Sequence, residues 1–212
     1  ALRRAGEETA VRILWDIRLP RAAAAMILGG ALALAGYLLQ TFFHNPIAGP
    51  FVLGISSGAK MTVALVMIWL MGRSVRVTSA AMILSAFVGA MLSMGFVLLL
   101  SRRMKGMSML VVAGVMIGYI CSAVTDLVVT FADDAQIVNL HNWSQGSLSG
   151  MPWENVQVMA WVTAAASLAV FFLSKPLDAY RLGETYAQNM GVNIRLLRAL
   201  IVILSSFLSA CV

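Results

Sequence analysis

An uncharged apolar run from Ala22 to Phe43 leads directly into a segment that proline and glycine interrupt, and this pairing constrains the fold most. The run is long enough to cross a hydrocarbon core about 30 Å thick, which needs roughly 20 helical residues. The next segment cannot continue the helix, because Pro46 and Pro50 lack an amide donor and its glycines favour other backbone angles. Irregular backbone near a membrane needs protein or a wet cavity around it. The pairing therefore predicts a transport pathway rather than a single-span anchor.

Composition places the chain among integral membrane proteins, in contact with lipid. Hydrophobic residues make up 60% and charged residues 11%, whereas soluble domains carry about 25% charged residues. The basic residues are spread over short loops, so the net charge of +6 does not indicate a nucleic-acid site. Cys121 and Cys211 lie inside apolar runs without ligand spacing. The sequence therefore predicts no disulfide framework, no metal site and no cofactor.

The apolar runs predict an all-α, polytopic transmembrane helical bundle. Helices are expected at about 22–43, 59–72, 78–100, 108–131 and 156–174, and from Ala199 onward. From Ala199 to Val212 a helix rises only about 21 Å, which is too short to span. We therefore expect residues 1–212 to form one transmembrane domain of a longer protein, truncated at both ends.

Charge gives little information on orientation, because the Lys and Arg residues of the loops divide equally between the two predicted sides. A slight excess of acidic residues on one side favours placing the opposite side, that of Arg102 and Arg181, in the cytoplasm.

Small residues recur at four-residue steps on three of the predicted helices, where they allow close backbone approach. We expect these stripes to be buried against other helices. They are Ala25, Gly29 and Ala33; Ser85, Gly89 and Ser93; and Gly114, Gly118 and Ser122. Asp126 continues the last stripe, and its position near the end of the run favours an interfacial or vestibule location over a functional intramembrane carboxylate.

The Gly54–Gly58 stretch fits the G-x-S-x-G pattern of a hydrolase nucleophile elbow, with Ser56 as the nucleophile. That motif requires a preceding strand and a nearby histidine. Here it follows a membrane helix, and His44 and His141 are predicted on opposite sides. A membrane-embedded hydrolase is therefore kept as an alternative only.

Residues 178–192 form an amphipathic segment between the fifth run and the last one. Gly183 and Gly191 are expected to bracket a helix of about two turns. The segment predicts a docking element at the membrane surface, with a simple interfacial helix as the alternative.

Four blocks of the sequence carry a family resemblance. They are Arg18–Arg21 (RLPR); Gly29–Gly36 (GGALALAG) with Gln40; the stretch Asn45-Pro46-Ile47-Ala48-x-Pro50-x-x-Leu53-Gly54-x-x-x-Gly58-Ala59; and Leu182-Gly183-Glu184-x-x-Ala187-x-x-Met190-Gly191-Val192. Together they resemble the permease subunits of bacterial ABC importers for iron-siderophore, heme and cobalamin, the FecCD-type or type II importers.

The resemblance implies a fragment of a ten-helix permease subunit in the bacterial inner membrane that pairs with a second copy, most simply as a homodimer. Two separate ATP-binding cassette subunits would hydrolyse ATP, so the chain itself would not be an enzyme. An extracytoplasmic binding protein would deliver the chelate, whose identity the sequence does not reveal. A secondary transporter is the main alternative, although the sequence shows no Asp/Glu/His proton relay.

The resemblance also assigns residues to three sites. Gate or pathway residues are Gln40, Asn45, Ile47 and Ser108; binding-protein docking residues are Arg18 and Arg21; and ATPase-docking residues, within the cytoplasmic coupling segment 178–192, are Leu182, Gly183, Glu184, Ala187, Met190 and Gly191.

Overall fold

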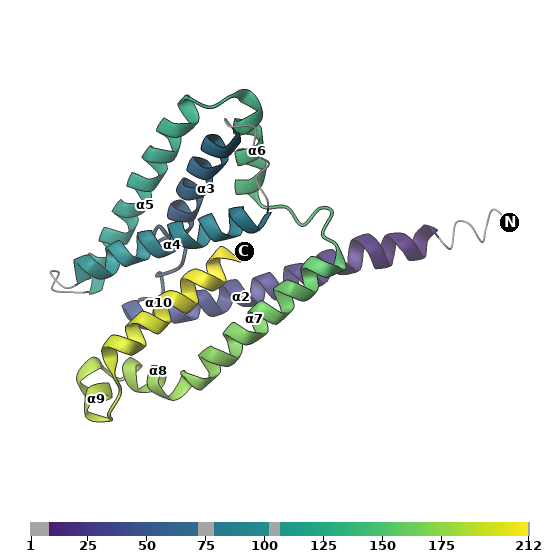
Figure 1. Cartoon of the computed structure of the whole chain (residues 1–212). Coiled ribbons are helices and arrows are strands. Elements are labelled where there is room, and N and C mark those ends of the chain that lie inside the picture. Colours follow the sequence, from purple (N-terminus) through teal and green to yellow (C-terminus); the bar gives the residue numbers. More distant parts are fainter. Residues whose placement is uncertain (1–8, 72–78, 102–106, 212) are drawn as a thin grey trace.

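The computed structural model of the chain describes residues 9–71, 79–101 and 107–211, and over these ranges it contains helices and turns but no strands (Figure 1). The elements are η1 (Ile13–Arg18), α2 (Leu19–Phe43), α3 (Ile55–Met71), α4 (Ser79–Ser101), α5 (Met107–Thr130), α6 (Asp134–Gln145), α7 (Trp153–Phe172), α8 (Ser174–Arg181), α9 (Glu184–Asn189) and α10 (Ile194–Ala210).

Within the described ranges, four helices are long and apolar enough to cross a membrane, and they match predicted spans. They are Thr9–Phe43, Ala81–Leu100, Met109–Thr130 and Trp153–Phe172. The all-α membrane fold is therefore confirmed. Helices α3 and α10 are shorter, at 17 residues each.

The first helix begins well before the predicted residue 22, because residues 9–12 are helical and η1 continues them into α2. In η1 the backbone widens, so that the Leu19 N–H donates to the Leu14 carbonyl five residues back. Pro20 has no N–H, and its ring would clash with the Asp16 carbonyl in a regular α-helix. A π-helical turn directly before Pro20 relieves that conflict and keeps the helix continuous.

The helices form two neighbouring groups that α10 connects (Figure 1). In one group α3 packs against α4 and α5, and in the other α2 packs against α7 and α10. Helix α10 also contacts α4. The core between them is apolar and includes the fully buried side chains of Leu38, Leu39 and Ile201.

Two helices were not predicted. Helix α6 packs against α3, and its first turn is closed by the Asp133 N–H, which donates to the Gln136 Oε1 at 3.2 Å. It is as polar as it is apolar, so a search for apolar runs misses it. Helix α8 is short and polar on one face, and it begins directly after α7.

The small-residue stripes of α4 and α5 are buried as predicted at most positions. The Ser93 Oγ donates to the Gly54 carbonyl at 2.9 Å, and the Thr62 Oγ1 of α3 donates to the Ser85 carbonyl at 2.7 Å. A Cβ on Gly89 would collide with the backbone carbonyl of Gly58, so α3 and α4 touch at the backbone.

The predicted burial is not found within the described residues for the other stripe members, because Ser122 on α5 and Ala25, Gly29 and Ala33 on α2 are exposed. Asp126 is exposed near the end of α5, and its expected interfacial or vestibule location stays a prediction. The buried face of α2 lies elsewhere on the helix. It consists of Pro20, Ala24, Leu28, Ala31, Ala35, Leu38, Leu39, Thr41, Phe42 and Phe43.

Candidate functional site

The segment between α2 and α3 re-enters the helical bundle, as the proline and glycine pattern predicts. It ends at Gly54, whose φ of 73° lies in the left-handed region and which is packed against Gly114 and Gly118 of α5. Gly118 lies about 16 Å along α5 from Met107 at 1.5 Å per residue. Helix α3 therefore begins well inside the membrane-spanning part of the bundle.

The backbone of this re-entrant segment is hydrogen-bonded within the protein. Irregular backbone at membrane depth requires such partners, because lipid offers none. The bonds run from the Asn45 N–H to the Gln40 carbonyl (3.1 Å), from Ala48 to Asn45 (3.1 Å), from Leu53 to Gly49 (3.0 Å) and from Ile55 to Pro50 (3.1 Å).

Two of the four predicted gate residues, Asn45 and Ile47, lie in one turn directly after α2, and Gln40 lies in the last turns of α2 itself. The Asn45 Oδ1 accepts the Ile47 N–H at 3.0 Å, which fixes the Asn45 side chain, and the Ile47 side chain is 70% exposed. Gln40 is also exposed, one turn before the end of α2. Ser108 is in the first turn of α5, and its side chain lies outside the described part of the chain. The exposed Ile47 side chain is apolar, and Asn45 and Gln40 carry uncharged amides.

The predicted docking segment, residues 178–192, contains the end of α8 and the whole of α9, which are joined by Leu182 and Gly183. Gly183 and Gly191 have φ angles of 127° and 83°, so the predicted glycine brackets around a short helix are confirmed. Leu182 and Met190 are 72% and 65% exposed. Ala187 is fully buried and packs inside the chain, so its side chain is not on the exposed surface of this segment.

Glu184 is paired within the chain, a contact that the sequence did not reveal. Its Oε2 accepts from the Arg198 Nη2 of α10 at 2.7 Å. Burial raises the pKa of the nearby Tyr180 phenol, and the Arg198 guanidinium opposes that rise. This cluster attaches α9 to the start of α10.

Tyr180 also connects the docking segment to the end of α2. Its hydroxyl donates to the Phe42 carbonyl at 3.4 Å, and the Tyr180 carbonyl lies 3.1 Å from the His44 Nε2. Tyr180, Arg198 and His44 were all missed at the sequence level. Phe42 and His44 are more than 130 residues from Tyr180 in the chain, and no local pattern pairs them.

Arg18 and Arg21 lie at the opposite end of α2, and both are exposed. The Trp153 Nε1 donates to the Trp15 carbonyl at 2.9 Å, so α7 begins beside this end. Helix α2 rises about 36 Å over its 25 residues. The structure therefore separates the two arginines from the docking segment by the length of α2, as predicted.

The arrangement around Ser56 does not support a nucleophile elbow. No strand precedes it within the described ranges, and it lies at the beginning of α3. The His44 ring is hydrogen-bonded to Tyr180, and His141 is exposed on α6. Neither histidine is hydrogen-bonded to Ser56.

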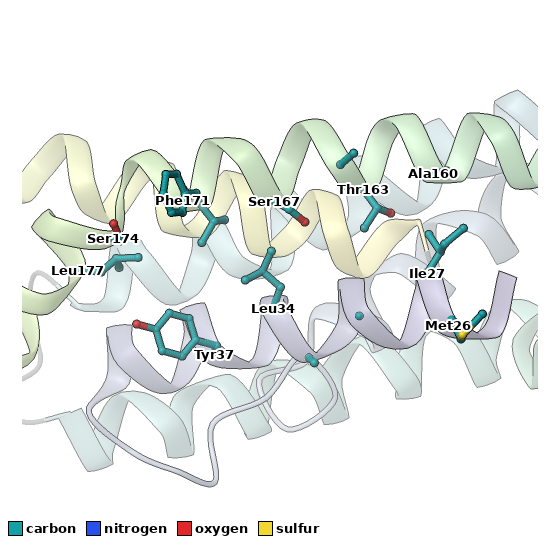
Figure 2. Close-up of a pocket in the computed structure, with 14 residues that line it drawn as sticks. Met26, Ile27, Leu34, Tyr37, Ala160, Thr163, Ser167, Phe171, Ser174 and Leu177 are labelled. Carbon is teal, nitrogen blue, oxygen red and sulfur yellow. The ribbon is translucent and has the colours of Figure 1, made fainter. Parts of the chain in front are cut away.

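A groove of about 780 Å³ runs between α2 and α7 (Figure 2). Leu34 and Tyr37 of α2 lie on one side of it, and Thr163, Ser167 and Phe171 of α7 lie on the other. Its lining contains no acidic, basic or histidine side chain and none of the predicted gate residues. The groove is therefore a mainly apolar surface separate from the predicted gate residues.

Comparison with known proteins gives concordant results. The whole chain, residues 1–212, matches the FecCD transport family. It is 36% identical over 195 residues to the vitamin B12 import system permease protein BtuC of Klebsiella pneumoniae, and 36% identical over 201 residues to BtuC of Serratia proteamaculans. Each match covers 92% of this chain and 58% of the relative.

The structure is also similar to that of a putative metal-chelate type ABC transporter solved in an inward-facing conformation. The TM-score is 0.81 at 26% identity, over 96% of this chain and 64% of that one. The chain thus spans less than two thirds of the length of these relatives.

Proposed function

The chain belongs to the FecCD transport family, and from this premise we propose that it forms part of the permease subunit of an ATP-driven chelate importer in the bacterial inner membrane. The observation that carries the proposal is the re-entrant turn of Asn45 and Ile47, which is bonded to the docking segment through Tyr180. Cobalamin is the first substrate to test, because the BtuC relatives are named for it. Iron-siderophore and heme chelates belong to the same proposal.

ATP hydrolysis is assigned to separate subunits, because the 212 residues contain no G-x-x-x-x-G-K-[ST] phosphate loop. The docking segment, within residues 178–192, would lie on the cytoplasmic side and present Leu182 and Met190 to an ATPase. Movement of α8 and α9 would then alter the gate turn and give alternate access to the pathway.

A second permease copy and a binding protein complete the proposed assembly. Pairing into a homodimer is supported by the resemblance and by one side of α5 that the described residues leave uncovered, where Met109, Val112, Met116 and Tyr119 are exposed. The external binding protein is assigned to the end of α2 that carries Arg18 and Arg21.

Transport by the full-length protein is expected to require ATP. The protein is reconstituted in liposomes with its ATPase subunits and binding protein. Labelled cobalamin should accumulate when ATP is supplied on the side of the membrane that carries the ATPase subunits. Replacement of the lysine in the partner ATPase's phosphate loop should abolish accumulation. Labelled iron-siderophore and heme, tested in parallel, identify the preferred chelate. Uptake driven by a proton gradient without ATP would contradict the proposal and support a secondary transporter.

Reversal of the two exposed arginines, Arg18→Glu with Arg21→Glu, is expected to weaken capture of the binding protein. Charges at the rim of an interface mainly set the association rate and its salt dependence. The loss should therefore be largest at low ionic strength, where the Debye length is about 30 Å at 0.01 M. Surface plasmon resonance on full-length protein in nanodiscs measures it. Arg12→Glu, an exposed arginine further along the same helix, is the matched control. Unchanged low-salt association of the double variant would assign both arginines to the lipid interface.

A further inference from the structure

We infer that His44 and Tyr180 form the joint through which the docking segment moves the gate turn. This inference rests on the proposed ATP-driven function, because it concerns how movement of α8 and α9 would reach Asn45 and Ile47. Neither residue lies in the four sequence blocks that carry the family resemblance. The contacts around the Tyr180 carbonyl point to this role.

The Tyr180 carbonyl is shared by the two elements that it would connect. The Gly183 N–H, at the turn between α8 and α9, donates to it at 3.1 Å. The His44 Nε2 lies 3.1 Å from the same oxygen. A carbonyl has two lone pairs and only accepts, so the His44 Nε2 carries the proton and donates. One oxygen atom thus holds the hinge of the docking segment and the end of α2 together.

The Tyr180 side chain makes the connection rigid. It is fully buried, and its hydroxyl donates to the Phe42 carbonyl at the end of α2. The rings of His44 and Tyr180 lie 5.0 Å apart, and Phe42 and Phe43 pack edge to face beside them. Tyr180, Phe42 and Phe43 are buried and can transmit displacement, because protein interiors are dense and have low compressibility, whereas the His44 ring is exposed and is held by its hydrogen bond to the Tyr180 carbonyl.

His44 is directly connected to the gate turn. Its φ of 47° is left-handed and ends α2, and its N–H is bonded to the Gln40 and Thr41 carbonyls. The next residue is Asn45, whose Oδ1 accepts the Ile47 N–H. A shift of the His44 ring would therefore change the direction in which the chain leaves α2, and Ile47 would move with it.

A second connection leads away from the gate. The Glu184–Arg198 pair attaches α9 to α10, which packs against α2 and α4. The two connections can be separated by substitution, because Glu184 and His44 share no hydrogen bond. Removal of the His44 bond should leave movement of the docking segment intact and disconnect the gate.

Two substitutions at His44 distinguish a joint from a merely structural residue. His44→Gln keeps an N–H donor at the position of Nε2, whereas His44→Asn is too short to reach the Tyr180 carbonyl. Asparagine tolerates the left-handed backbone well, so loss of the bond is the main change in His44→Asn. Tyr180→Phe, which removes only the hydroxyl bond to Phe42, provides a second variant.

The experiment follows both ends of the joint. Spin labels are placed singly at exposed Leu182 and at exposed Ile47 in the full-length protein with its ATPase subunits, and label mobility is recorded with and without Mg-ATP. In the parent, nucleotide should change both spectra. In His44→Asn, nucleotide should change the Leu182 spectrum alone. The amount of cobalamin transported per ATP hydrolysed should fall about fivefold or more, which is the lower end of the usual range of coupling between sites. His44→Gln should restore both readouts to within about twofold of the parent, and Tyr180→Phe should show a smaller loss in the same direction.

The outcomes separate this inference from the proposed function. If nucleotide changes neither spectrum in the parent, the proposed ATP-driven function fails. If both spectra respond in the parent and also in His44→Asn, the joint is overturned while the function stands. If His44→Gln is as defective as His44→Asn, the donor is not the feature that matters and the inference is likewise overturned.

Discussion

Gly54→Ala is expected to lower the free energy of unfolding by about 2–5 kcal/mol, from backbone strain of about 1–2 kcal/mol and overpacking of about 1–3 kcal/mol. The φ of 73° is unfavourable for alanine. The new Cβ would lie 2.7 Å from the Gly118 amide nitrogen and 2.9 Å from the Gly114 carbonyl oxygen. Both neighbours are backbone atoms of α5, so no side-chain rotation relieves the contact. Since whole domains are stable by only about 5–15 kcal/mol, the loss is large.

Thermal unfolding of the full-length protein in detergent, followed by tryptophan fluorescence, measures this effect. Gly49→Ala is the matched control, because it lies in the same re-entrant segment and has open space around its Cβ position. Gly118→Ala should be intermediate, because its Cβ would approach the Gly54 Cα at 3.2 Å. Equal melting temperatures for Gly54→Ala and Gly49→Ala would show that α5 can move away from Gly54 at little cost.

The close backbone approach at Gly54 shows how far the sequence alone could lead. Small residues on α4 and α5, together with a proline- and glycine-rich segment, predicted tight packing and an interrupted membrane helix. Both follow from local rules on backbone angles and side-chain volume. The identity of the helix that packs against each stripe does not follow from local rules, because many helix pairs satisfy the same volume requirement. The stripe of Ala25, Gly29 and Ala33 looked equivalent on the sequence, yet it is exposed.

The docking segment shows the same division. Gly183 and Gly191 marked the ends of α9 correctly, because helix ends favour glycine for its freedom at positive φ. The roles of individual residues in it depended on long-range contacts. Ala187 is buried, and Glu184 is bonded to Arg198. The resemblance grouped these residues with Leu182 and Met190 as one docking surface, whereas the structure exposes only part of it.

The intrachain pair changes what substitution at Glu184 should report. Glu184→Arg is expected to lower cobalamin transported per ATP hydrolysed at least about fivefold, in line with the usual range of coupling between sites. It would place a second guanidinium beside Arg198, and like charges at this distance would push α9 away from α10. Affinity for the binding protein should be unchanged, because the surface proposed for it, at Arg18 and Arg21, lies at the far end of α2. Asp178→Arg is the matched control: Asp178 is exposed on α8 and forms no ion pair within the described residues.

The charge swap Glu184→Arg with Arg198→Glu decides how Glu184 acts. If its carboxylate serves to position α9 against α10, the swap rebuilds the pair in reverse and should restore transport per ATP to within about twofold of the parent, because the pair's interaction is then recovered. The swap leaves the exposed residues Leu182 and Met190 unchanged, so they would still be available for the proposed contact with the ATPase. Tryptophan fluorescence should first show that both single variants and the swap are folded. If the swap then fails to restore transport, the Glu184 carboxylate itself touches the ATPase. The carboxylate is partly exposed, at 39% of its side-chain surface, so it is accessible to a partner, and only the swap separates direct contact from positioning.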